Sequence, residues 1–172
     1  METEKDIVNR VASSTLVTFD LEQYYTPGVR LLIDIKDQLY QGLMLREKDF
    51  RDYIKAHDWA QYKNKLIAVT CSEDAIIPAW AYMLLTSVLE PHARIIVLGT
   101  LEDLETKIFS DSLAAIDWTQ FKNAKVVIKG CSKLPVPMAA YIEATRMLRP
   151  HVASIMFGEP CSTVPVYKKP KV

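Results

Sequence analysis

Hydrophobic and polar positions form the same succession of segments twice along the chain. A short run of β-branched and apolar residues is followed by a long apolar segment, and a second short apolar run closes the series. The short runs predict buried strands and the long segments predict helices. The predicted order is strand, helix, strand, with residues 66–70, 75–90 and 94–98 in the first copy and residues 126–129, 137–149 and 153–157 in the second.

Further elements precede these two copies. Residues 31–35 form an apolar run that predicts a strand, and residues 42–56 and 104–115 mix apolar and charged positions in the pattern of an amphipathic helix. Residues 1–29 give no single pattern. We treat them as an N-terminal extension that forms an edge strand, an arm onto another subunit or a flexible tail.

An internal repeat supports this segmentation. The heptapeptide Asp58–Asn64 returns as Asp117–Asn123, and the matching positions continue to a glycine that closes each copy, Gly99 and Gly158. Glycine there supplies the positive φ with which a chain can leave a strand. The repeat spans about residues 57–99 and 116–158.

Each copy is therefore a β-α-β unit, and such units are right-handed and build parallel sheets covered by helices. The sequence predicts a single α/β domain over residues 1–172, with three layers and a mainly parallel sheet built from a tandem duplication. Ligands of such sheets bind beyond the carboxyl ends of the strands. We expect the equivalent loops of the two copies to meet at that edge.

Composition narrows the choice of partners. The 172 residues are 49% hydrophobic and 24% charged, and 21 basic side chains balance 21 acidic ones. A neutral chain does not favour non-specific binding to nucleic acid, and no apolar run is long enough to suggest a membrane span. Three cysteines are too few for a disulfide scaffold, which predicts a reducing, cytoplasmic location.

The three cysteines are the main candidates for chemistry. All three follow predicted strands, and all are followed by serine: the pairs are Cys71-Ser72, Cys131-Ser132 and Cys161-Ser162. Three converging thiolates suit a soft metal, so Cys71, Cys131 and Cys161 are candidate ligands of a zinc ion or an iron–sulfur cluster. The serine hydroxyls are candidate cofactor contacts, because they can donate to a thiolate or cap the turn.

Two alternatives remain open. In the first, the protein is a metal-free thiol enzyme or sulfur carrier with one nucleophilic cysteine and one resolving cysteine. In the second, the cysteines are inert and the chain binds a small molecule or a protein.

The repeat-equivalent pairs Tyr82/Thr86 and Tyr141/Thr145 predict a helix face buried against the other copy. No catalytic residue and no oligomeric state follow from the sequence.

Three stretches carry a resemblance to a known family: Leu45–Arg51, Cys71–Tyr82 and Gly158–Pro165. The chain resembles a bacterial domain-of-unknown-function family, DUF 2480, from Ile7 to about Lys169. The resemblance implies no defined activity. It implies a link to iron–sulfur assembly proteins as partners, because genes of that family often stand beside those of the assembly machinery. On this basis an iron–sulfur cluster is favoured over zinc.

Overall fold

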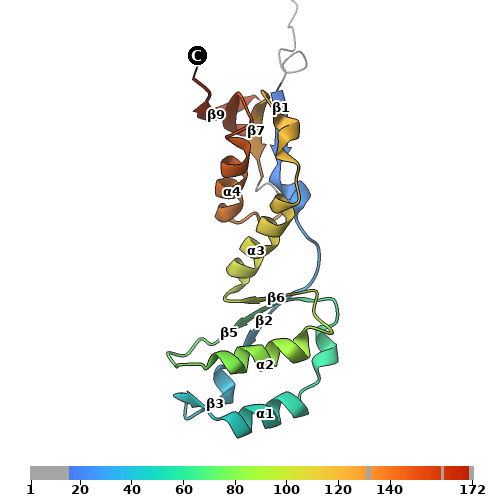
Figure 1. Ribbon diagram of the computed structural model, residues 1–172, viewed down its shortest axis with the longest axis vertical. Coiled ribbons are helices and arrows are strands. Elements are labelled where there is room, and N and C mark those ends of the chain that lie inside the picture. The colour runs from blue at the N-terminus through green and yellow to red at the C-terminus, as the bar shows by residue number, and fades with distance from the viewer. Residues whose placement is uncertain (1–15, 131–132, 160, 171–172) are drawn as a thin grey trace, which may run out of the picture. The chain divides into compact units, whose positions relative to one another are not determined.

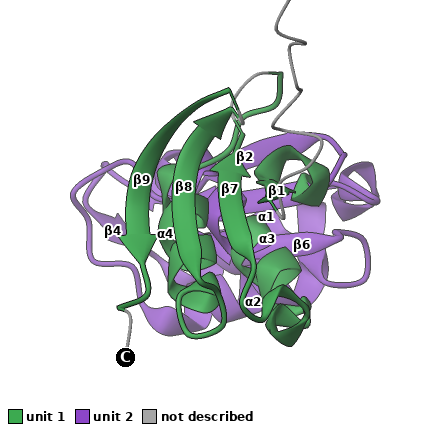
Figure 2. Cartoon of the chain, turned by 90° about the horizontal axis from the view of Figure 1, so that it is seen from above, with its two compact units in different colours: residues 1–25, 109–172 green, residues 26–108 purple. Residues whose placement is uncertain are grey.

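A computed structural model describes residues 16–130, 133–159 and 161–170 (Figure 1). The chain divides into two compact units (Figure 2): unit 2 is residues 26–108, and unit 1 is residues 1–25 together with 109–172. The sequence of unit 2 is thus inserted into that of unit 1. Both units are mixed α/β with mostly parallel strands, so the predicted fold class is confirmed.

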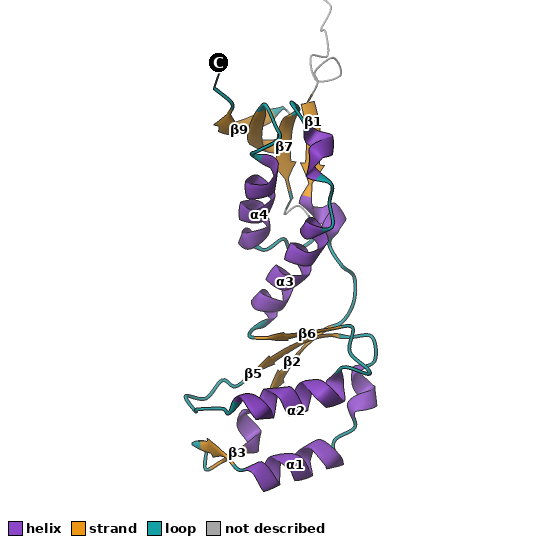
Figure 3. Cartoon of the chain, in the orientation of Figure 1, coloured by secondary structure: helices purple, strands orange, loops and turns teal. Residues whose placement is uncertain are grey.

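Unit 2 is built around a three-stranded parallel sheet in the order β2-β5-β6 (Figure 3). A short antiparallel ribbon, β3-β4, stands apart from this sheet. The elements of unit 2 are β2 (Arg30–Asp34), the 3₁₀ helix η2 (Ile35–Gln38), β3 (Leu39–Tyr40), β4 (Met44–Leu45), α1 (Glu47–Ala56), the 3₁₀ helix η3 (Trp59–Tyr62), β5 (Leu66–Thr70), α2 (Ala79–Leu89) and β6 (Ile95–Leu98).

The central strand of unit 2 is covered on both faces. Ile67 and Val69 of β5 pack into a core cluster with side chains of α1 and α2, among them Phe50. The alternate residues Leu66 and Ala68 form a second cluster with the first half of α3 (Leu101–Ala114). Since successive side chains of a strand point to opposite faces, β5 reads as a continuous apolar run and this unit has three layers.

Unit 1 repeats this plan with one more strand. Its sheet has the order β1-β7-β8-β9, in which the first three strands are parallel and β9 is antiparallel to β8 (Figure 2). The elements are β1 (Leu16–Asp20), the 3₁₀ helix η1 (Leu21–Tyr24), the second half of α3, the 3₁₀ helix η4 (Trp118–Phe121), β7 (Lys125–Lys129), α4 (Met138–Leu148), β8 (Ser154–Glu159) and β9 (Ser162–Lys168).

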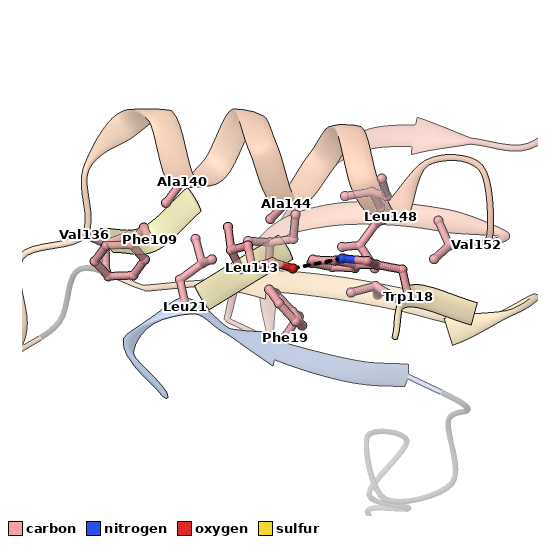
Figure 4. Close-up of a cluster of buried hydrophobic side chains, with 13 residues drawn as sticks. Phe19, Leu21, Phe109, Leu113, Trp118, Val136, Ala140, Ala144, Leu148 and Val152 are labelled. Atoms are coloured by element: carbon pink, nitrogen blue, oxygen red, sulfur yellow. Dashed lines mark hydrogen bonds between the residues drawn. The ribbon is translucent and has the colours of Figure 1, made fainter. Parts of the chain in front are cut away.

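One core cluster holds unit 1 together (Figure 4). Phe19 of β1 and Trp118 contact each other at a centroid distance of 5.2 Å, and Leu148 of α4 packs in the same cluster. Phe109 and Leu113 bring in the second half of α3. These side chains are buried, and apolar burial of this kind is the main stabilising contribution to a fold.

The Asp-Trp repeat has a structural role. Asp58 and Asp117 accept a hydrogen bond from the backbone N–H two residues on and thereby cap η3 and η4. Trp59 Nε1 donates to the carbonyl of Ile54 at 2.7 Å, and Trp118 Nε1 donates to that of Leu113 at 3.1 Å. Each tryptophan therefore satisfies the free end of the preceding helix, which explains why the motif occurs in both units.

One expectation about the layout is corrected. The two copies do not share one sheet, because β5 and β7 are the central strands of separate sheets among the described residues. For the N-terminal extension one of the three predicted alternatives is found in residues 16–20, since β1 is an edge strand of unit 1 and η1 follows it. The description of residues 1–172 as a single domain stays a prediction. Gly99 and Gly158 have φ values of 135° and 120°, as expected.

Candidate functional site

The carboxyl ends of the strands in unit 2 meet around Asp34. Its carboxylate Oδ1 accepts hydrogen bonds from the backbone N–H of Lys36 and from that of Ser72, both at 3.1 Å. The first contact caps η2 and the second ties the end of β2 to the turn after β5. Asp34 thus fixes the turn that carries Cys71.

The environment of Asp34 shifts its ionisation. Burial by itself raises the pKa of Asp34, but hydrogen bonds from the Ser72 side chain and from the backbone of Lys36 and Ser72, together with the charge of Lys36, leave the pKa below its usual value. Both the N–H and the hydroxyl of Ser72 are therefore directed to Asp34. A contact from Ser72 to a cofactor stays a prediction.

Cys71 is half-buried at the end of β5 and packs against the core of unit 2. Its Sγ lies 3.7 Å from the backbone carbonyl of Glu73, to which the thiol donates. Burial raises the pKa of the Tyr82 hydroxyl, and the negative charges of Cys71 and Asp34, when these are ionised, raise it further. Tyr82 therefore lies within electrostatic reach of this thiol.

In unit 1 the corresponding strand ends carry a charged cluster. Lys129 Nζ, at the end of β7, lies 3.5 Å from Asp20 Oδ2 at the end of β1 and 3.9 Å from Glu159 Oε1 at the end of β8. The carboxylate of Glu22 in η1 accepts from the backbone N–H of Lys133 at 2.8 Å. These contacts link three strand ends to the loop that leads into α4.

A single inserted residue distinguishes the two central strands. Asp34 pairs with Thr70 and Asp20 pairs with Lys129, so Gly130 occupies the position that Cys71 has in unit 2. A Cβ atom added to Gly130 would stand 2.9 Å from the hydroxyl oxygen of Tyr141. A side chain at this position would require the tyrosine hydroxyl to shift.

The structure places the cysteines as follows. Cys161 is exposed in the turn between β8 and β9, and Ser162 next to it is the first residue of β9. Cys71 belongs to unit 2 and Cys161 to unit 1, while Cys131 and Ser132 lie outside the described residues. Among the residues that the structure describes, no three His, Cys, Asp or Glu side chains are grouped so as to hold a metal ion. Convergence of the three thiols stays a prediction.

The repeated tyrosine and threonine pairs lie beside the buried faces of their helices. The buried face of α2 consists of Ala81, Leu85 and Leu89, whereas Tyr82 is half-buried and Thr86 is exposed. The pair therefore does not belong to the side of α2 that packs on the core of unit 2. Burial of this face against the other copy stays a prediction.

Each of these outward faces lines a hollow. In unit 2 the hollow is lined by Tyr82, Met83, Thr86, Ser87 and Glu90. In unit 1 it is almost wholly apolar and is lined by Ile128, Met138, Tyr141, Thr145, Met156, Phe157 and Val166. Sequence reasoning missed both hollows. The sequence did contain a signal for them. The tyrosine and threonine recur in both copies, at helix positions next to the apolar positions that are buried.

Comparison with known proteins adds a family and no function. No helix among residues 16–130, 133–159 and 161–170 is long and apolar enough to cross a bilayer. No curated protein and no solved structure is significantly similar to the chain. The family model described as a protein of unknown function, DUF2480, matches residues 5–169. The chain belongs to this family.

Proposed function

We propose that the protein holds a thiolate-bound metal centre, an iron–sulfur cluster in the first instance, and serves in cluster assembly or transfer. The observation that supports the proposal is the topology of unit 1. Its strands β7 and β8 are parallel neighbours, and in sequence Cys131 and Cys161 each come two residues after their ends, Lys129 and Glu159. Loops that follow adjacent parallel strands share one edge of a sheet.

The chemistry of the donor set favours a soft metal. Thiolates bind zinc and iron–sulfur clusters, and a tetrahedral site needs four donors. The two thiols of unit 1 are two of these four donors. Cys71, which follows the equivalent strand of unit 2, is the third donor that we propose. A centre with three protein thiolates leaves one position for an exchangeable ligand, as transfer of a cluster requires.

The surroundings of Cys161 are compatible with this role. The thiol is exposed at the tip of the β8–β9 hairpin, where Glu159 and Ser162 are paired. Lys129, bracketed by Asp20 and Glu159, supplies a positive charge at the same strand ends.

The test is metal analysis of protein purified without oxygen. Iron, sulfide and zinc per chain are measured together with the absorption spectrum for the wild type and for Cys71→Ser, Cys131→Ser and Cys161→Ser. We expect bound iron and sulfide in the wild type and loss from each variant. Ser87→Ala is the control, since it removes a serine hydroxyl on α2 and keeps all three thiols and the serines that follow them.

The outcomes separate the alternatives. If zinc is found without sulfide, the centre is a zinc site on the same three cysteines and not an iron–sulfur cluster. Full metal content in any single cysteine variant would contradict the three-ligand centre. Absence of metal after anaerobic reconstitution with iron and sulfide would overturn the proposal. Selective alkylation of one cysteine would then identify a metal-free thiol enzyme.

A further inference from the structure

Unit 1 contains a hollow of about 430 Å³ between α4 and its sheet. This volume lies within the range of about 300–1,000 Å³ that is typical of small-molecule sites. Met138, Tyr141 and Thr145 form the helical wall, and the strands supply the other wall. Of the cysteines that the structure describes, neither Cys71 nor Cys161 lines the hollow.

Strand β9 contributes Val166 to the wall of the hollow. Helix α4 buries Ala140, Ala144 and Leu148, which leaves its neighbouring side facing the last two strands. Phe157 of β8 and Val166 of β9 remain 46% and 53% exposed. Exposed apolar side chains that lie next to one another often mark a binding site, whereas single exposed apolar side chains need no explanation.

The shape of the hollow follows the helix. Met138, Tyr141 and Thr145 succeed one another along one side of α4, and the seven steps from Met138 to Thr145 span about 10 Å at 1.5 Å per residue. The Thr145 hydroxyl donates to the carbonyl of Tyr141 at 2.7 Å, so its donor is used within the helix. The Tyr141 ring meets that of Phe157 edge to face at 5.8 Å. These walls fit an unbranched apolar chain.

A cation lies beyond one end of the hollow. Arg149 follows Thr145 by one helical turn, and its guanidinium lies 5.1 Å from the ring centroid of Tyr167, the neighbour of Val166. Within the described part of the chain Arg149 makes no ion pair, whereas Arg146 is held by Glu143 at 2.6 Å. Arg149 is thus a cation at this end that can receive an anion.

We propose that unit 1 binds an amphipathic carboxylate, a medium-chain fatty acid, in this hollow. The chain lies between α4 and the β8–β9 strands, and the carboxylate pairs with Arg149. Charge complementarity selects this class of ligand, because the guanidinium recognises a carboxylate with two parallel hydrogen bonds. The Lys129 end does not compete for the headgroup, since Asp20 and Glu159 flank that lysine.

The experiment is titration calorimetry with decanoate below its micelle-forming concentration, using the full chain. We expect saturable binding to the wild type. Arg149→Gln should raise the Kd of decanoate about tenfold by removing the charged hydrogen bonds. The same variant should leave the Kd of decanol, the neutral analogue, within about twofold, because the chain contacts are unchanged.

Two controls make the result specific. Arg146→Gln removes a neighbouring charge that is already paired, and the Kd of decanoate should not change. Met138→Glu places a charge in the wall and should abolish binding, whereas Met83→Glu alters a similarly exposed methionine of unit 2 and should not; both residues are mostly exposed, so both variants should fold. Lack of saturable binding, wild-type binding by Met138→Glu, or an unchanged Kd in Arg149→Gln would each overturn the proposal.

Discussion

Units 1 and 2 share a folding plan and differ in the residues beside α4 in unit 1 and beside α2 in unit 2. Both have a first strand that ends in a capping aspartate, a buried central strand, a Trp-capped helix and a third parallel strand. Unit 1 adds β9 and inserts Gly130. The repeated features are those that stabilise the fold, while the differences concentrate at the strand ends and beside α4.

The two hollows show this divergence most directly. Tyr82 and Thr86 of unit 2 match Tyr141 and Thr145 of unit 1, so an equivalent pair of helix side chains lines each hollow. At the far end unit 2 has Glu90, which lines its hollow, where unit 1 has the cation Arg149. Duplication has therefore preserved a scaffold, and the two hollows differ in charge and polarity.

The largest expected effect comes from the matched core leucines. Leu89 and Leu148 are equivalent and fully buried, and each belongs to the core of its own unit. Leu89→Ala and Leu148→Ala should each lower the free energy of unfolding by about 2–5 kcal/mol, from lost apolar burial and the cavity left behind. Urea denaturation followed by circular dichroism measures the change.

Hydrogen exchange in the same two variants decides whether the units unfold separately. We expect Leu148→Ala to reduce protection in residues 109–170 and to leave residues 26–100 protected, because the core clusters do not share residues. Leu89→Ala should give the reverse. Equal loss of protection in both units would contradict independent unfolding and would support the single domain predicted from the sequence.

The next effect separates two repeat-equivalent glycines, Gly99 directly after β6 and Gly158 near the end of β8. A Cβ at Gly158 would stand 2.6 Å from the backbone carbonyl oxygen of Ser162, whereas at Gly99 the nearest atom, at 2.4 Å, belongs to the side chain of Asp103. A side chain can rotate away from the added Cβ atom, whereas the backbone of a paired strand cannot. Gly158→Ala should therefore cost about 2–3 kcal/mol and Gly99→Ala about 1–2 kcal/mol, since both also strain a positive φ.

Thermal unfolding of both glycine variants gives the comparison. A larger loss in Gly99→Ala than in Gly158→Ala would show that the hairpin of β8 and β9 adjusts more readily than the start of α3. In that case β9 would be a loosely attached strand. The argument that β9 forms a fixed wall of the hollow would then fail.

Much of the fold could be predicted from the sequence, because both periodicity and repetition point to it. The strand at 66–70 has the bounds that the pattern predicts, and the helices differ by a few residues at their ends. Strand β9 was not predicted, since Pro165 within residues 162–168 interrupts the donor pattern of a strand. The proline is tolerated because it sits on an edge strand beside a register shift.

The division into two sheets could not be predicted from the repeat. Residues 16–20 carry the first strand of unit 1, yet they precede the whole of unit 2 in sequence. A repeat shows which segments are alike and not which strands pair, because pairing partners are set by long-range contacts. For the same reason the spacing of the cysteines could not assign them to separate units.

A smaller effect is expected from the two described cysteines. Cys71→Ser should cost about 1 kcal/mol in metal-free protein, because the half-buried thiol packs on the core of unit 2 and a hydroxyl is less favourable there. Cys161→Ser should change stability by less than about 0.5 kcal/mol, since this thiol is exposed. Urea titration of chelator-treated samples tests both; equal effects would show that Cys161 has core contacts as well.

The smallest effect concerns the pH dependence of stability at the strand ends of unit 2. Because the pKa of Asp34 is lowered in the folded protein, its ionised form contributes stability that is complete above the ordinary aspartate pKa, about 4, and is lost as the pH falls through the folded value. Asp34→Asn keeps an acceptor for Lys36 and Ser72 but cannot titrate. The variant should therefore be slightly less stable than the wild type at pH 7, and the difference should shrink below pH 4. Thermal unfolding from pH 3 to pH 7 measures it. A difference that grows on acidification would mean that Asp34 is protonated more readily in the folded state, and that burial outweighs the hydrogen bonds which fix the Cys71 turn.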